Sequence, residues 1–333
     1  MPVMKTPRRF GSSRIVIFTA AALLSVTLLA RLCPAQDQEQ DQSTIRVDVN
    51  LVVLEATVKN KSGQIMSGLK KDDFIVKEDG ATQKIMHFSQ DQLPLDVALI
   101  LDVSDSMKPF LGPLHDAAST ALDTLKPEDK VTFYTFSTMP QRLVDLTSEK
   151  RKIAERIDLV TGEDIGGSTN INGAIFEAAQ YLLQEAPRGR RVIVVITDTV
   201  ATDNGGVAPV DVVQESLAAD TAVYCLKVPG DNPLSTRMAA AQIPGLINMD
   251  KVAQQTGGEV FDVEKLGSLT TAFSALIERI KTRYTIGYYS SGNGATGNLH
   301  KIDVRLEKSY GSKGKDYTML SKTGYYYIPK AAQ

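Results

Sequence analysis

The sequence predicts an α/β protein with a doubly wound, mostly parallel sheet covered by helices on both faces, together with a small β-sandwich formed from N- and C-terminal strands. Three observations lead to this prediction. Apolar runs typical of buried strands alternate with amphipathic segments between residues 97 and 280. Short segments in which apolar and polar residues alternate lie before this region, at 45–90, and after it, from residue 283. Oxygen-bearing side chains follow the apolar runs, where a parallel sheet binds its ligands.

The first 35 residues have the layout of a secretory signal peptide. Basic residues precede an apolar run at 15–30, and Cys33, Pro34 and Ala35 offer a small-x-small cleavage site. The run is shorter than the ~18–20 residues of a membrane-spanning helix. We therefore predict a signal peptide at 1–35, a flexible lead-in at 36–44 and an exported protein that is periplasmic, attached to the cell envelope or secreted. An uncleaved N-terminal anchor is the alternative, and it alone would place the chain at a membrane.

Charge and cysteine content narrow the classes of partner. The chain has 37 basic and 39 acidic residues, and a formal net charge of −2. The predicted signal contains basic residues but no acidic ones, so its cleavage would leave an acidic exported chain. An acidic chain argues against nucleic acid as a partner. Of the two cysteines, Cys33 lies in the predicted signal and Cys225 in an apolar run. No intrachain disulfide would remain, and we expect Cys225 to be a small buried hydrophobe.

The terminal segments predict strands that need a packing partner. The segment IRVDVNLVVLEATVK alternates apolar and polar residues, and Gly-containing turns divide the stretch that follows it. The C-terminal segments RYTIGYYS, HKIDVRLEKS and YTMLSKTGYYYIP have the same character. Two or three strands alone are marginally stable in water. We predict that N-terminal strands at 45–94 pair with C-terminal strands at 282–330 and that the domain at 95–281 is inserted between them; two independent β appendages are the alternative.

The inserted region predicts alternating strands and helices. Strands are expected at 97–102, 131–137, 191–198, 221–228 and 259–263. Segments with a 3.6-residue apolar period predict helices at 112–125, 150–159, 171–184, 210–219, 249–256 and 269–281. Such a pattern favours a parallel sheet with ligands beyond the carboxyl ends of its strands.

Oxygen-bearing residues follow three of these segments. The run VALILDVSDSM presents Asp102, Ser104 and Ser106 at alternate positions, GGSTNI offers Thr169, and RVIVVITD ends at Asp198. Hard oxygen ligands suit Mg²⁺, Mn²⁺ or Ca²⁺, and these five residues would leave one position of an octahedron for water or a partner's carboxylate. Taken singly, each residue would serve equally well in a turn or a helix cap.

The five residues together resemble the von Willebrand factor type A family, whose metal-ion-dependent adhesion site is written DxSxS, then T, then D on successive loops. The resemblance spans about 95–280, and the flanking strands are similar to those of exported von Willebrand A-related proteins of acidobacteria. It implies a doubly wound α/β domain that binds Mg²⁺ and captures an acidic residue of a protein partner. In many members glycine follows the second aspartate, whereas Thr199 follows Asp198 here.

We therefore predict a non-enzymatic, exported protein-binding module for adhesion or interaction. One alternative is an assembly scaffold of the cell envelope whose site is vacant or purely structural. A Mg²⁺-dependent hydrolase is a less favoured alternative, because the histidines His87, His115 and His300 suggest no Ser/His/Asp arrangement. The sequence does not identify the partner or the oligomeric state.

Overall fold

The computed structural model describes residues 51–90, 93–161, 166–187, 189–230, 247–290, 297–307 and 316–326. The chain divides into two compact units, Met1–Asp48 and Val49–Gln333, and all described residues belong to the second. The predicted signal peptide and lead-in lie outside the described residues. Within the described ranges, no helix has both the length and the apolar character needed to cross a membrane.

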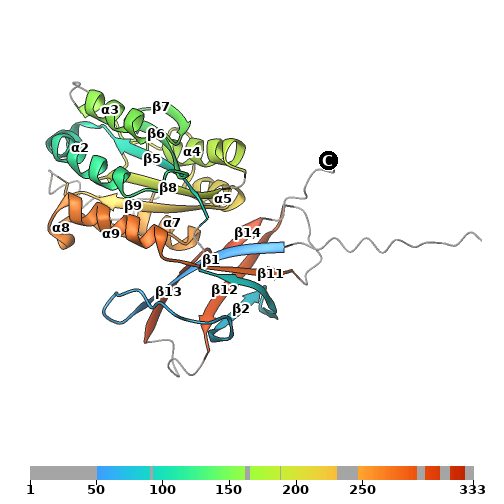
Figure 1. The fold of residues 1–333 in the computed structure, drawn as a ribbon. Coiled ribbons are helices and arrows are strands. Elements are labelled where there is room, and N and C mark those ends of the chain that lie inside the picture. The colour runs from blue at the N-terminus through green and yellow to red at the C-terminus, as the bar shows by residue number, and fades with distance from the viewer. Residues whose placement is uncertain are drawn as a thin grey trace, which may run out of the picture. The chain divides into compact units, whose positions relative to one another are not determined.

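A six-stranded sheet forms the core of the inserted region (Figure 1). In chain order its strands are β5 (Leu95–Asp102), β6 (Lys130–Phe136), β7 (Pro140–Thr147), β8 (Arg190–Thr197), β9 (Thr221–Lys227) and β10 (Val260–Asp262). The spatial order is β10-β9-β8-β5-β6-β7, and every neighbouring pair is parallel except β6 and β7. The central strand β5 is buried along its whole length, as expected when helices cover both faces. The predicted fold class is confirmed.

The antiparallel edge strand β7 is an element that the sequence did not predict. Its residues are half-buried or exposed, and it begins with a proline, which edge strands tolerate. Tertiary contacts hold it in place: the Leu146 N–H donates to the Tyr181 hydroxyl at 2.9 Å, and the Arg142 guanidinium lies 4.1 Å from the centre of the Tyr181 ring. Contacts between residues this far apart in sequence leave no local periodicity to detect.

Helices cover both faces of the sheet. On one face α2 (Lys108–Asp123), α3 (Lys150–Thr161) and α9 (Leu269–Lys281) pack on side chains such as Leu99, Leu101 and Phe133. The other face carries α4 (Ile171–Glu185), α5 (Pro209–Ala218) and α7 (Met249–Thr256), which pack on the alternate side chains of the same strands, such as Ile100. The alternation of the strand side chains thus divides one sheet between two apolar cores. A short helix, α8 (Val263–Leu266), precedes α9.

The terminal strands form two four-stranded antiparallel sheets that share an apolar core. One sheet has the order β13-β1-β11-β4, built from β1 (Leu51–Asn60), β4 (Ile85–Ser89), β11 (Tyr284–Tyr289) and β13 (Tyr317–Ser321). The other has the order β14-β12-β2-β3, built from β2 (Phe74–Glu78), β3 (Ala81–Gln83), β12 (Leu299–Leu306) and β14 (Gly324–Tyr326). A 3-10 helix at Lys71–Asp73 precedes β2. Each sheet combines strands from before and after the inserted region.

Arg190, the first residue of β8, contacts both ends of the inserted region. Its N–H donates to the Pro94 carbonyl at 3.0 Å, and its guanidinium donates to the Ile280 carbonyl at 2.8 Å. The same guanidinium pairs with Glu55 of β1, which also accepts from Arg283 at 3.0 Å. Arg283 is buried, and that burial lowers the pKa of its guanidinium, while the charge of Glu55 acts in the opposite direction. One carboxylate therefore balances two buried cations.

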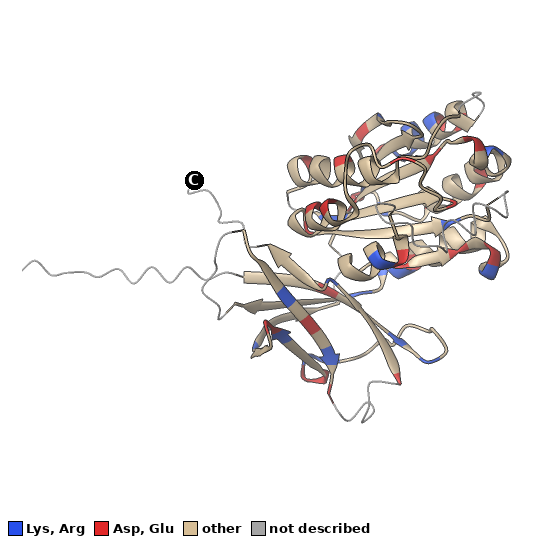
Figure 2. Ribbon diagram, turned by 180° about the vertical axis from the view of Figure 1, so that it is seen from behind, with Lys and Arg blue, Asp and Glu red and all other residues tan. Residues whose placement is uncertain are grey.

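Lys, Arg, Asp and Glu are distributed over helices and strands alike (Figure 2). Ion pairs on α3, such as Arg151 with Glu155 at 3.5 Å, have both side chains largely exposed. Pairs of this kind contribute little to stability because solvent screens them and both side chains lose conformational freedom. The Glu55 pairs differ from these surface pairs, since protein surrounds their cations.

Candidate metal centre

The candidate site lies at the carboxyl end of β5. This strand has β6 on one side and β8 on the other, so the direction of strand addition reverses there, and open α/β sheets bind ligands at such a reversal. Asp102 is the last residue of β5, and Asp198 directly follows β8. Thr169 lies in the loop that leads into α4.

Asp102 is fully buried and held by two donors. The Ser104 N–H donates to Oδ1 at 2.9 Å, and the Thr197 hydroxyl donates to Oδ2 at 2.6 Å. Burial raises the pKa of Asp102 to about 6, and the negative charge of Asp198 acts in the same direction; the hydrogen bonds from Ser104 and Thr197 oppose this shift. The two hydrogen bonds therefore fix the orientation of the carboxylate, while burial makes its negative charge unfavourable.

Asp198 is only 3% exposed and is incompletely paired. Its Oδ1 accepts from the Val200 N–H at 3.0 Å. Its Oδ2 is buried and has no hydrogen-bond partner within the described residues. A buried carboxylate oxygen without a donor is unfavourable unless a cation is supplied.

The serine side chains of the first loop lie together. The Ser104 and Ser106 hydroxyl oxygens are 3.3 Å apart, with Ser104 buried and Ser106 half-buried. Asp105 between them is mostly exposed; its Oδ2 accepts from the Gly167 N–H at 3.4 Å, which connects this loop to the loop of Thr169.

Thr169 is joined to the loop that follows Asp198. Its N–H donates to the Thr202 hydroxyl at 2.8 Å, and its carbonyl accepts from the N–H groups of Thr202 at 3.1 Å and Asp203 at 3.2 Å. The structure thus ties Asp102, Ser104 and Ser106 to one another directly, and Thr169 to the Asp198 loop through Thr202.

Sequence reasoning missed two positioning residues, Thr197 and Thr202. Thr197 orients Asp102 from the neighbouring strand, and Thr202 fixes the backbone of Thr169. A signal existed for Thr197, because a threonine interrupts the apolar run just before Asp198. No local pattern marks Thr202, whose partner lies 33 positions earlier in the chain.

The position where the family often has glycine is strained in this chain. Thr199 has φ +66°, in the left-handed region that β-branched residues rarely adopt. Its N–H donates to the Thr197 hydroxyl at 3.0 Å, which holds this conformation. The departure from glycine therefore leaves the turn after Asp198 in place, with backbone strain stored beside the candidate site.

Thr199→Gly is expected to raise the free energy of unfolding by about 1 kcal/mol. Glycine relieves a left-handed strain of ~1–2 kcal/mol, and this gain exceeds the loss caused by the greater entropy of glycine in the unfolded chain. Urea denaturation followed by far-UV circular dichroism measures the change. Thr120→Gly, on the exposed side of α2, is the matched control and should lower stability instead. A loss of stability in both variants would contradict the strain at Thr199.

The donor set fits a hard divalent cation. Two buried carboxylates lie close enough for one to raise the pKa of the other, and hydroxyls accompany them. Neither carboxylate forms an ion pair with Lys, Arg or His within the described part of the chain. Carboxylate and hydroxyl oxygens without nitrogen or sulfur suit Mg²⁺, Mn²⁺ or Ca²⁺ better than zinc or copper.

Comparison with known proteins gives a family match and several similar folds. Residues 97–201 match the family model of the von Willebrand factor type A domain. No curated protein matches the sequence. A solved structure of an aerotolerance-related membrane protein from Bacteroides fragilis is 20% identical, covers 56% of this chain and 98% of its own, and has a TM-score of 0.44.

Two further solved structures are similar at the same level. Proximal thread matrix protein 1 from the mussel byssus, with a zinc-occupied MIDAS motif, is 15% identical over 61% of this chain and 49% of its own, with a TM-score of 0.44. A von Willebrand factor type A protein from Catenulispora acidiphila is 11% identical over 83% of this chain and 74% of its own, also with a TM-score of 0.44. Likenesses at this level do not bear on what the chain binds. The match at 97–201, on a doubly wound sheet with helices on both faces, identifies a von Willebrand factor type A domain within this chain.

Proposed function

We propose that this protein is an exported interaction module that holds a divalent cation, Mg²⁺ in the first instance, at Asp102, Ser104, Ser106, Thr169 and Asp198. The observation that carries the proposal is the buried, unpartnered Oδ2 of Asp198 beside the buried carboxylate of Asp102. A cation would relieve the repulsion between these two charges and provide the missing partner for Oδ2. The ion would supply positive charge at the end of β5, and the five protein residues would hold the ion in place.

The expected ligand is an acidic side chain of a partner protein. Five protein ligands leave one position of an octahedron, and that position suits a carboxylate from outside the chain. Ser106 is half-buried and Asp105 is exposed, so the first loop has a face that a partner would reach. Export rests on the predicted signal peptide at 1–35, and an assembly scaffold of the cell envelope is the competing function.

Calorimetric titration with Mg²⁺ and Mn²⁺ tests the site. We expect one ion per chain, with affinity at least about tenfold weaker in Asp102→Ala, because a charged ligand is lost. Asp198→Asn keeps an acceptor for the Val200 N–H and should weaken binding similarly. Asp116→Ala, an exposed carboxylate on α2, is the matched control and should bind as the unmodified protein does.

The two functions give different results with partners. A protein captured from the cell envelope in Mg²⁺ and released by EDTA would support the interaction module, provided that Asp102→Ala captures none. Cation binding without any cation-dependent capture would favour the scaffold. Absence of Mg²⁺ and Mn²⁺ binding in the unmodified protein would overturn the proposed site.

A further inference from the structure

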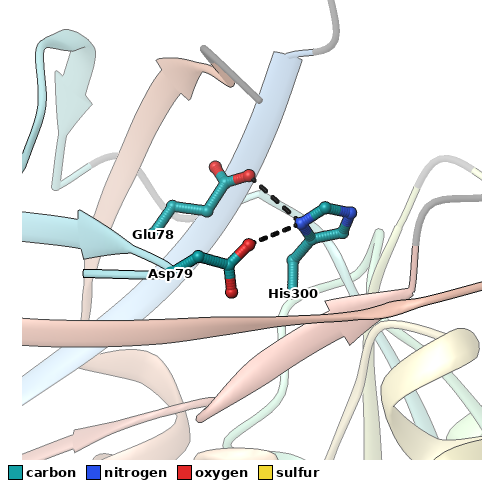
Figure 3. Close-up of side chains that lie close together, drawn as sticks. All are labelled: Glu78, Asp79 and His300. Carbon is teal, nitrogen blue, oxygen red and sulfur yellow. Dashed lines mark hydrogen bonds and ion pairs between the residues drawn. The ribbon is translucent and has the colours of Figure 1, made fainter. Parts of the chain in front are cut away.

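A second group of potential metal ligands lies in the β-sandwich, outside the candidate metal centre. Glu78 ends β2, Asp79 occupies the turn that follows, and His300 lies on β12 (Figure 3). Glu78 and His300 each belong to the buried, inward-facing set of side chains on their strands. The group therefore closes one end of the sandwich core with polar atoms instead of apolar ones.

The turn fixes Asp79 in place. Asp79 and Gly80 have φ values of +48° and +86°, and two residues in this region between paired strands form a tight hairpin turn. The Asp79 N–H donates to the Lys301 carbonyl at 2.9 Å, and its Oδ1 accepts from the Lys301 N–H at 2.8 Å. The Lys301 N–H is the main cause of a lowered pKa for Asp79. The remaining oxygen, Oδ2, is directed at His300.

The ligand atoms have the spacing of a small metal site. One oxygen of Glu78, one of Asp79 and a ring nitrogen of His300 all lie within 4.8 Å of one another. His300 Nδ1 is 2.9 Å from Asp79 Oδ2 and 3.5 Å from Glu78 Oε1. These two distances bracket the ~3.3 Å that separates neighbouring ligands around a tetrahedral ion with bonds of ~2.0 Å.

Several buried polar atoms of this group lack partners. Glu78 is 3% exposed, and its Oε1 accepts from the hydroxyls of Ser290 at 2.7 Å and Tyr325 at 3.0 Å. Its Oε2 and His300 Nε2 have no hydrogen bond of normal geometry within the described residues, and the Tyr288 hydroxyl lies beside the Glu78 carboxylate. Burial raises the pKa of Tyr288, and the charge of Glu78 and a hydrogen bond with it act in the same direction. A nearly dry carboxylate that hydroxyl groups surround is a favourable place for a cation.

The balance of charge points the same way. Glu78 and Asp79 provide two carboxylates, and His300 is the one residue paired with them through an ion contact in the described part of the chain. An imidazole carries a full positive charge only when protonated. Stacking on Tyr325, at 5.2 Å between ring centres, holds the imidazole in place.

We propose that Glu78, Asp79 and His300 bind a divalent transition-metal ion, with zinc the best fit. One imidazole nitrogen with two carboxylate oxygens suits zinc and disfavours Mg²⁺ and Ca²⁺, which prefer oxygen alone. The ion would lie between His300 Nδ1 and the two carboxylates, in place of their direct contacts. It joins the β2–β3 turn to β12 and so stabilises the sandwich.

Zinc titration of the full chain carrying Asp102→Ala tests the proposal without interference from the candidate metal centre. Calorimetry is expected to give one zinc ion per chain and a rise in Tm with zinc. Adding His300→Gln should weaken zinc at least tenfold and abolish the rise in Tm. Asp79→Asn should also weaken zinc binding. Because asparagine tolerates positive φ, this variant keeps the turn and tests the site even if His300→Gln fails to fold.

His87→Gln is the matched control, because His87 is an exposed histidine on β4 of the same sandwich. This variant should bind zinc as the parent does. Zinc binding that is absent in the parent, or unchanged in Asp79→Asn and His300→Gln, would overturn the site. Loss of zinc on His87→Gln alone would likewise assign the ion elsewhere. These outcomes do not depend on whether Mg²⁺ binds at Asp102.

Discussion

Gly258→Ala is expected to lower the free energy of unfolding by about 3 kcal/mol or more, a large part of the total stability of a domain. Gly258 lies between α7 and β10, where the chain passes close to β9. A Cβ at this position would lie 1.8 Å from the Val223 carbonyl oxygen and 2.5 Å from its carbon. These are backbone atoms of a buried strand, so no side-chain rotation relieves the clash.

Urea denaturation of Gly258→Ala beside Gly112→Ala measures this effect. Gly112 lies on the exposed side of α2, and apart from its chain neighbours and the backbone of the helix nothing is within 4 Å of the place where its Cβ would be. Alanine lowers the entropy of the unfolded chain, but Pro113 disfavours the helical conformation of a preceding residue with a Cβ, so the net change should be smaller than ~1 kcal/mol. The same substitution should thus cost far more at Gly258 than at Gly112. A Gly258→Ala variant as stable as the unmodified protein would show that β9 and this loop separate easily.

Glu55→Ala is the second large effect, with an expected loss of about 3 kcal/mol. The side chains of Arg190 and Arg283 are 7% and 3% exposed, and Glu55 is the acidic residue paired with both in the described part of the chain. Its removal leaves two buried guanidinium groups without a counter-ion. A pocket of about 210 Å³ borders all three side chains, and water entering it keeps the loss near the lower end of the ~3–5 kcal/mol for a broken buried pair.

Thermal and urea unfolding of Glu55→Ala should be compared with Asp145→Ala. Asp145 accepts from Arg142 at 2.8 Å, but its side chain is 80% exposed. Loss of that pair should change stability by less than ~1 kcal/mol. If the two variants lose the same small amount, solvent screens the Glu55 pairs as it screens the pair at the surface.

Most of the α/β architecture could be predicted from the sequence because its signals are local. The predicted helices at 249–256 and 269–281 coincide with α7 and α9, and each predicted strand of the inserted region lies within two residues of an observed one. Long apolar strands and amphipathic helices carry their burial pattern in their own residues. The edge strand β7 was missed because it is stabilised by Tyr181, which lies more than thirty residues further along the chain.

The candidate site was only partly predictable. Asp102 and Asp198 were recognisable because each follows an apolar run that ends at the same edge of the sheet. Thr197 orients Asp102 from the neighbouring strand, and Thr202 fixes Thr169 from another loop. The conformation of Thr199 depends on a hydrogen bond to Thr197. The Glu78, Asp79 and His300 group left no signal at all, because strand pairing between β2 and β12 brings together residues more than two hundred positions apart.

The contacts of Arg190 with both ends of the inserted region affect the order of folding. Thr57 of β1 and the Thr282 carbonyl that accepts from its hydroxyl are 225 positions apart, so β1 is synthesised long before its neighbours β11 and β13. Closing a loop of that length in an unfolded chain costs entropy. In the folded insert, Pro94 and Ile280 are already close together, because Arg190 donates hydrogen bonds to both of their carbonyl groups. We therefore expect the insert to fold before the terminal strands pair, and β1 to lack its neighbours until β11 has been synthesised.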